Sequence, residues 1–93
     1  MFSIVIPAYN AASYIEKSIH SVLNQTVGDF EVLVIDDGST DGTQKIVETI
    51  RDDRIRYIYQ PNGGVSSARN MGIRSAKGDC IWQRARSGRA HPP

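Results

Sequence analysis

The sequence feature that most constrains the fold is a regular alternation of short apolar runs with amphipathic segments. Four apolar or β-branched runs predict strands, at Phe2 to Ile6, Phe30 to Ile35, Ile55 to Gln60 and Cys80 to Trp82. The first run stops at Pro7, and near-continuous runs of this kind are typical of strands buried on both faces of a parallel sheet.

Helical periodicity fills the gaps between these runs. The capping-box pattern from Ser13 to Glu16 predicts a helix that ends near Asn24, and a second helix is predicted to begin at Thr40 or Asp41. A third is predicted after the turn at residues 62–64, with Gly78 placed to end it. The residues expected on the buried faces of the three helices are Ile15, Ile19, Val22 and Leu23, then Ile46, Val47 and Ile50, then Val65, Ala68, Gly72, Ile73 and Ala76.

Alternating strands and helices predict an α/β fold, a Rossmann-like half with a parallel sheet of three to four strands and flanking helices. In a half-sheet of this kind the third strand is followed by the second, the first and the fourth. Ligands of such sheets bind beyond the carboxyl ends of the strands, so the polar loops at residues 7–10 and 36–41 are expected on one functional edge.

Several residues in these loops are candidates for binding. Tyr9 follows the first strand and can stack on a planar base or simply pack. Asp36 and Asp37 follow the second strand, where alternation sends their side chains in opposite directions, so one of them is expected to face a ligand. The alternative is that both carboxylates cap the loop and the next helix.

Arg69 is a candidate cation near the start of the third helix. A cation is disfavoured there by the helix dipole unless an anion neutralises it, and the guanidinium group matches a diphosphate well. A surface salt bridge to Asp36 or Asp79 is the alternative. The loop after the first strand lacks the glycines of a dinucleotide fingerprint, and no Walker sequence occurs, so those two phosphate-binding modes are excluded.

Length and composition limit the remaining possibilities. The 93 residues suit one small domain, and 40% hydrophobic with 23% charged residues is ordinary for a soluble protein. The single cysteine, Cys80, and the absence of a signal or membrane segment predict a cytoplasmic protein. If the protein associates with a membrane, it is expected to do so in a longer form.

The charges are distributed unevenly along the chain. All ten acids and eight of the eleven Lys/Arg residues precede residue 82, so the net charge is −2 for residues 1–81 and +3 for residues 82–93. That basic tail lacks aromatic platforms, and no nucleic-acid partner is expected.

Four stretches taken together resemble the opening of the family 2 glycosyltransferases, in the family's order and spacing. They run from Ile4 to Asn10, from Phe30 to Asp41, from Asn62 to Gly72 and over Gly78-Asp79. The resemblance covers residues 1–81, which we interpret as the N-terminal nucleotide-sugar-binding part of a GT-A domain.

The resemblance implies an enzyme that transfers a sugar from a nucleotide-diphospho-sugar, of uridine type, to an acceptor hydroxyl, with inversion and with a divalent metal, Mn²⁺ or Mg²⁺. It implies that Pro7, Tyr9 and Asp37 contact the base, that Asp36 supports the loop and that Arg69 approaches the diphosphate. The full set of implied binding residues is Pro7, Ala8, Tyr9, Asn10, Asp36, Asp37, Ser39 and Arg69.

The sequence departs from the family after Ile81. The family continues with apolar residues and an Asp-x-Asp or Asp-Asp metal cluster, whereas this chain continues with Trp82-Gln83-Arg84-Ala85-Arg86-Ser87 and has no acid after Asp79. Residues 82–93 resemble a disordered or frame-shifted tail, and neither a metal site nor a catalytic base is expected in this chain. We therefore expect nucleotide binding with little or no turnover. The alternative is a non-catalytic nucleotide-binding or interaction module, with self-association through an exposed sheet edge.

Overall fold

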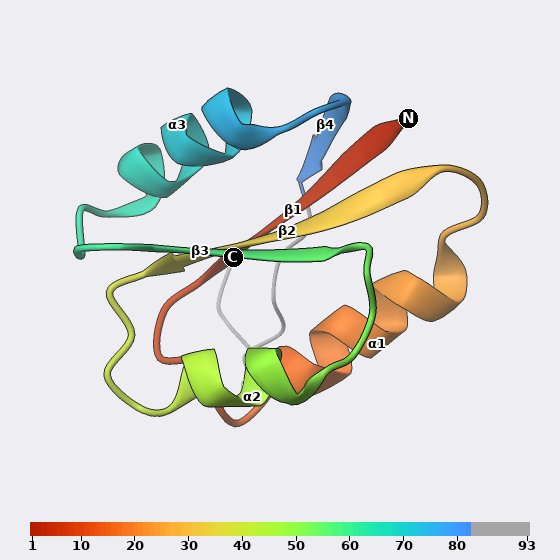
Figure 1. Cartoon of the computed structure of the whole chain (residues 1–93). Helices are drawn as coiled ribbons and strands as arrows, with labels where there is room; N and C mark the ends of the chain where they lie inside the picture. Colours follow the sequence, from red (N-terminus) through yellow and green to blue (C-terminus); the bar gives the residue numbers. More distant parts are fainter. Residues whose placement is uncertain (83–93) are drawn as a thin grey trace, which may run out of the picture.

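A computed structural model of the chain describes residues 1–82, and the predictions for residues 83–93 lie outside this part. Seven elements alternate along it, as predicted (Figure 1). They are β1 (Phe2–Ala8), α1 (Ile15–Gln25), β2 (Phe30–Asp37), α2 (Thr43–Thr49), β3 (Ile55–Gln60), α3 (Val65–Ser75) and β4 (Asp79–Trp82). Trp82, placed in the tail by the domain prediction, is the last residue of β4.

The four strands form one parallel sheet in the order β3-β2-β1-β4, which confirms the predicted topology. Helices α1 and α2 lie on one face of the sheet and α3 lies on the other (Figure 1). Every residue of β2 is buried, because this strand lies inside the sheet and is covered on both faces. In the part of the chain that the structure describes, β4 pairs with residues Phe2 to Val5 of β1.

Two apolar clusters hold the three layers together. The larger one joins β1 and β2 to α1 and α2, and the smaller one joins Val5, Leu33 and Ile35 to Ala68 of α3. The residues predicted for the buried face of α1 belong to the larger cluster or contact it. Ile15, Ile19 and Val22 are buried in this cluster, and Leu23 packs against it. The 3.6-residue period thus located the buried face of this helix correctly.

Two helix starts were predicted too early. Helix α1 begins at Ile15 without a side-chain cap, because the carbonyl of Ala11 accepts hydrogen bonds from the backbone N–H groups of Tyr14 and Ile15 and forms a preceding turn. Helix α2 begins at Thr43, because Gly42 before it has a φ of 94° in the left-handed region. Local capping patterns were outweighed in both places by the loop conformation.

The prediction for α3 was wrong at Ile73, whose residue surface is 55% exposed. The helix approaches the sheet through small residues, and a Cβ atom on Gly72 would lie 2.8 Å from Cγ1 of Val5. Ala68 and Gly72 therefore face the sheet, and Ile73, which follows Gly72 in the helix, faces solvent.

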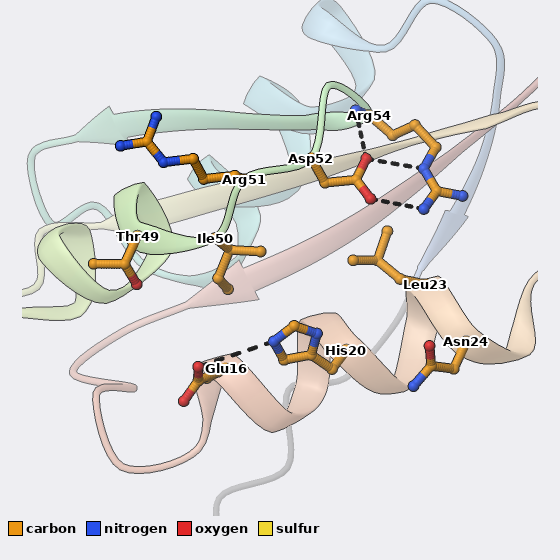
Figure 2. Close-up of a pocket in the computed structure, with 9 residues that line it drawn as sticks. All are labelled: Glu16, His20, Leu23, Asn24, Thr49, Ile50, Arg51, Asp52 and Arg54. Atoms are coloured by element: carbon orange, nitrogen blue, oxygen red, sulfur yellow. Dashed lines mark hydrogen bonds and ion pairs between the residues drawn. The ribbon is translucent and has the colours of Figure 1, made fainter.

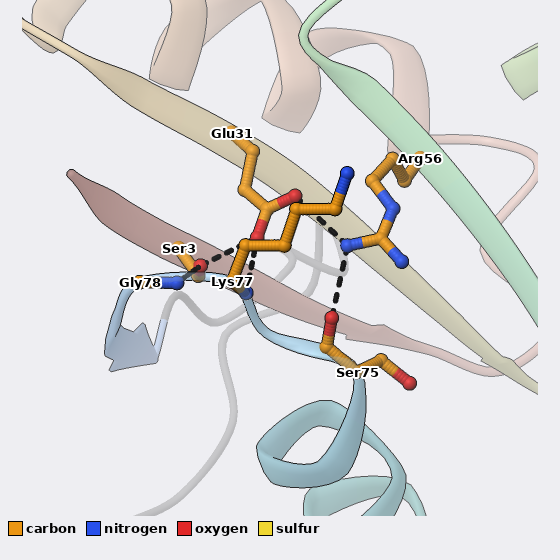
Figure 3. Close-up of polar contacts among 6 residues, drawn as sticks. All are labelled: Ser3, Glu31, Arg56, Ser75, Lys77 and Gly78. Carbon is orange, nitrogen blue, oxygen red and sulfur yellow. Dashed lines mark hydrogen bonds and ion pairs between the residues drawn. The ribbon is translucent and has the colours of Figure 1, made fainter.

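A buried polar network crosses the sheet near the amino ends of its strands (Figure 3). One carboxylate oxygen of Glu31 accepts hydrogen bonds from Ser3 Oγ at 2.6 Å and from the backbone N–H of Lys77 at 2.8 Å. The other accepts one from the Arg56 guanidinium at 2.9 Å, which also donates to the carbonyl of Ser75. The network thereby links β1, β2 and β3 to the connection between α3 and β4.

Candidate functional site

Three loops meet beyond the carboxyl ends of β1, β2 and β3, where ligands of parallel sheets bind. These are residues 9–14, 38–42 and 61–64, which we call the carboxyl-end loops. Side-chain hydrogen bonds connect the first loop to the second, and the carboxylate of Asp37 connects the end of β2 to the third. The site is therefore a joined block of loops on a rigid sheet.

Asn10 is the main connection between the first two loops. Its backbone N–H donates to Ser39 Oγ at 2.8 Å, and its side-chain oxygen accepts from the backbone N–H of Thr40 at 2.9 Å. Its φ of 48° lies in the left-handed region, which asparagine tolerates better than most residues. The side-chain oxygen of Asn10, predicted to bind ligand, is thus already used to position the loop.

Asp41 and Thr43 form a second connection. Thr43 Oγ1 accepts a hydrogen bond from the backbone N–H of Ala11 at 2.9 Å and donates one to Asp41 at 2.6 Å. The other oxygen of Asp41 accepts from the N–H of Ala12 at 3.1 Å. Burial raises the pKa of Asp41, but the hydrogen bonds from Thr43 and Ala12 outweigh burial and hold the pKa below its ordinary value. The loops are tied by an ionised carboxylate.

The two adjacent aspartates face different surroundings, as alternation along β2 predicted. The Asp36 carboxylate is fully buried, accepts from the backbone N–H of Ser39 at 2.8 Å and accepts a short hydrogen bond from the hydroxyl of Tyr57. Burial first, and then this contact, raise the pKa of Tyr57. The Asp36 carboxylate thus has no solvent access, and the hydrogen bond that it accepts from Ser39 fixes the start of the loop after β2.

Asp37 points the other way and is 7% exposed. Its Oδ1 accepts from Gln60 Nε2 at 2.7 Å and from the N–H of Gly63 at 2.9 Å, and its Oδ2 accepts from the N–H of Gly64 at 3.0 Å. Burial raises the pKa of Asp37, but the hydrogen bonds from Gln60, Gly63 and Gly64 outweigh it and hold the pKa below its ordinary value. Asp37 therefore caps the approach to α3, not the next helix, and stays ionised at neutral pH.

The second and third loops also touch through their backbones. A Cβ atom on Gly38 would lie 2.6 Å from the backbone nitrogen of Asn62, and Gly38 has a φ of 82°. Asn62 Nδ2 donates in turn to the carbonyl of Asp37 at 3.1 Å. Only glycine fits this close approach at position 38, which explains the Asp-Asp-Gly sequence physically.

The remaining predicted site residues divide into buried and exposed ones. The side chain of Ala8 belongs to the larger apolar cluster, and Pro7 is half-buried beside Ile35 in the sheet. Tyr9 is 53% exposed at the end of β1. Of the predicted base contacts, the ring of Tyr9 is thus the one most available to a ligand.

Arg69 lies in the second turn of α3 and is exposed. Its guanidinium carbon sits 5.5 Å from the centroid of the Trp82 ring, a cation–π contact. None of the ion pairs found within residues 1–82 involves Arg69, so the alternative of a salt bridge to Asp36 or Asp79 does not occur there. The charge of Arg69 remains available to an anion.

Sequence reasoning missed several residues that build the site. Thr43, Asp41, Gln60 and the amide groups of Gly63 and Gly64 fix the carboxyl-end loops, but were not predicted as site residues. The sequence Pro61-Asn62-Gly63-Gly64 could have indicated these contacts, because it marks a turn whose free N–H groups need an acceptor.

The adjacent aspartates do not fit a divalent cation. Asp36 is fully buried, and Asp37 points away from it with three hydrogen bonds to N–H donors. Within residues 1–82 no group of three or more His, Cys, Asp or Glu side chains is placed to hold a metal ion. In the same part of the chain, no helix is long and apolar enough to cross a bilayer.

A separate cavity of about 410 Å³ lies between α1 and the connection from α2 to β3 (Figure 2). It is lined by Glu16, His20, Leu23, Asn24, Thr49, Ile50, Arg51, Asp52 and Arg54. Arg54 and Asp52 in its lining form an ion pair at 2.7 Å, and His20 lies 3.9 Å from Glu16. The Arg54 guanidinium also lies over the ring of Phe30. None of the predicted site residues lines this cavity.

The fold and the joined loops define an α/β protein of the class that binds ligands beyond the carboxyl ends of a parallel sheet. Residues 3–83 match the sequence model described as Glycosyl transferase family 2. The chain therefore belongs to glycosyl transferase family 2, which confirms the resemblance.

Individual relatives agree with this assignment. An uncharacterised glycosyltransferase of Bacillus subtilis, EpsJ, is 47% identical over 83 residues, which make up 87% of this chain and 24% of EpsJ. The crystal structure of S. aureus TarS 1-349 in complex with UDP-GlcNAc is 34% identical with a TM-score of 0.81, over 89% of this chain and 26% of that one.

A third similar protein is the mannosyltransferase PcManGT of Pyrobaculum calidifontis, solved in complex with GDP-Man and Mn²⁺. It is 30% identical with a TM-score of 0.73, over 82% of this chain and 24% of that one. The chain thus spans about a quarter of EpsJ, of the TarS 1-349 chain and of PcManGT. The structural matches confirm the predicted α/β fold with flanking helices.

Proposed function

We propose that this chain forms the donor-nucleotide site of a glycosyltransferase, which transfers a sugar from a uridine diphospho-sugar to an acceptor hydroxyl with inversion. The observation that carries the proposal is the block of carboxyl-end loops, in which internal hydrogen bonds fix the backbone. They leave Tyr9 exposed after β1, and the ionised Asp37 ends the neighbouring strand β2. A fixed block of this kind binds with little loss of conformational entropy.

Tyr9, Asp37 and Arg69 each suit one part of such a donor. The ring of Tyr9 offers a face for stacking on the base, and Asp37 Oδ2 has room for one further N–H donor. Arg69, exposed and without an acid partner in residues 1–82, offers a positive charge to the diphosphate. Complexes of TarS with UDP-GlcNAc and of PcManGT with GDP-Man support a nucleotide-sugar as the ligand class.

The ring of Tyr9 provides the cleanest test, because it is exposed and its loss leaves the loop hydrogen bonds in place. Stacking of a base on an aromatic ring is worth about 1–3 kcal/mol. We expect Tyr9→Ala to weaken UDP binding by about tenfold in calorimetric titration, with an unchanged melting temperature. Tyr59→Ala is the matched control, since Tyr59 is 52% exposed and Tyr9 is 53% exposed.

Two results would decide against the proposal. If the wild-type chain fails to bind UDP, the donor site is wrong, and if Tyr9→Ala and Tyr59→Ala bind UDP equally, Tyr9 does not stack on the base. Release of UDP from a UDP-sugar in the presence of acceptors would then favour a glycosyltransferase, whereas binding without turnover fits both this function and the alternative, a non-catalytic nucleotide-binding module.

A further inference from the structure

The Asp37 carboxylate has nearly all of its acceptor capacity used inside the protein. A carboxylate offers about four lone-pair positions. Gln60 Nε2 and the N–H of Gly63 occupy both positions of Oδ1, and the N–H of Gly64 occupies one position of Oδ2. One position on Oδ2 remains for a ligand, and the residue keeps 7% of its surface exposed.

The number of free acceptor positions discriminates between nucleobases. Uracil presents one N–H on its pairing edge, between two carbonyl groups, and this N–H can be satisfied by a single acceptor. Guanine presents an N–H and an amino group side by side, which a free carboxylate accepts with both oxygens. With Oδ1 occupied, one of the two guanine donors would be buried without a partner, which costs affinity.

We propose that Gln60 is a specificity-determining residue: by occupying Oδ1 of Asp37 it makes the site select a base with a single N–H donor, such as uracil, over guanine. This rests on the proposed donor-nucleotide site. The Gln60 side chain is itself held in place, because it is buried and its amide also lies 3.2 Å from Ser67 Oγ. The amide groups of Gly63 and Gly64 belong to the backbone, so Gln60 is the one of the three donors that a substitution can remove.

Leucine at position 60 keeps the approximate volume and removes the donor. We expect the wild type to bind UDP at least about tenfold more tightly than GDP, and Gln60→Leu to reduce that ratio by about tenfold, because a second acceptor position becomes free. Ser67→Ala is the matched control, since it removes the other contact of the Gln60 amide and leaves the contact to Asp37. Its ratio should equal that of the wild type.

A second measurement needs no variant and covers the case in which Gln60→Leu does not fold. Inosine diphosphate has the purine size of GDP but lacks the amino group, so it presents a single N–H. We expect the wild type to bind it about tenfold more tightly than GDP. Equal binding of inosine diphosphate and GDP, or an unchanged ratio in a folded Gln60→Leu variant, would overturn the role of Gln60. Absence of all nucleotide binding by the wild type would instead overturn the proposed function.

Discussion

Replacing Glu31 by glutamine tests the energetic importance of the network that joins the sheet to α3 and β4. The wild-type carboxylate accepts from Ser3 Oγ, from the N–H of Lys77 and from the Arg56 guanidinium. A glutamine has a single acceptor oxygen at this point, so its amino group must face either Arg56 or the pair of Ser3 and Lys77. At least one donor then loses its acceptor in a buried environment.

The size of the effect follows from burial. Hydrogen bonds to charged groups are worth about 1.5–3 kcal/mol each, and an unpaired buried donor costs about 1–3 kcal/mol. The side chain of Glu31 is 8% exposed but that of Arg56 is 35% exposed, so solvent screens part of the ion pair. We therefore expect Glu31→Gln to lower the free energy of unfolding by about 2–3 kcal/mol, which for a domain of this size lowers the melting temperature by about 10–20 °C.

Thermal and urea melts at neutral pH measure this loss. Asp52→Asn is the control, because Asp52 forms an ion pair with Arg54 of similar length, 2.7 Å against 2.9 Å, but in an exposed loop, where the loss should be smaller. Equal melting temperatures of Glu31→Gln and the wild type would refute the reasoning.

The same network predicts a pH dependence. Burial raises the pKa of Glu31, but hydrogen bonds from Ser3, Lys77 and Arg56 lower it below its ordinary value of 4.5. A lowered pKa in the folded state means that the stabilisation is complete above pH 4.5 and is lost as pH falls through the folded pKa. The difference in stability between the wild type and Glu31→Gln should therefore shrink as pH falls below 4.5.

Two further predictions concern the metal and the sheet edge. Asp36 is fully buried, and the carboxylate of Asp37 accepts hydrogen bonds from N–H donors. Mn²⁺ should therefore raise UDP affinity by less than about tenfold in calorimetric titration. A larger gain would mean that these carboxylates do bind metal. Within residues 1–82, the four residues of β4 pair with only part of β1, and Phe2 and Ile81 are exposed. The chain should therefore be marginally stable and self-associate in light scattering across a concentration series, whereas a monomer with a concentration-independent melt at high temperature would contradict this.

The strands could be predicted from sequence because burial on both faces leaves a local signal. The apolar runs gave the position of β2 to within a few residues, and the alternation along it placed Asp36 and Asp37 on opposite faces. The helix starts could not be predicted as well, because the conformation of the loop before each helix decides them. Gly42 and the carbonyl of Ala11 outweighed capping patterns that are read from neighbouring residues alone.

The site could be predicted only in part, for a similar reason. Family resemblance pointed to Tyr9, Asp37 and Arg69, but the capping of Gly63 and Gly64 by Asp37 joins residues 26 and 27 positions apart. No local pattern contains such a contact. Glu31 within an apolar strand was a usable signal of a buried ion pair, since a carboxylate is rarely buried without a partner, but its partner Arg56 is 25 positions away.

The most direct test of a donor site at the carboxyl-end loops is a map of backbone amide NMR shifts during titration with UDP. We predict saturable shifts for the amides of Asn10, Ser39, Gly63 and Gly64, which lie in or beside the proposed site, and unchanged shifts for residues 51–54 beside the separate cavity. Shifts confined to residues 51–54, or none anywhere at millimolar UDP, would contradict the account.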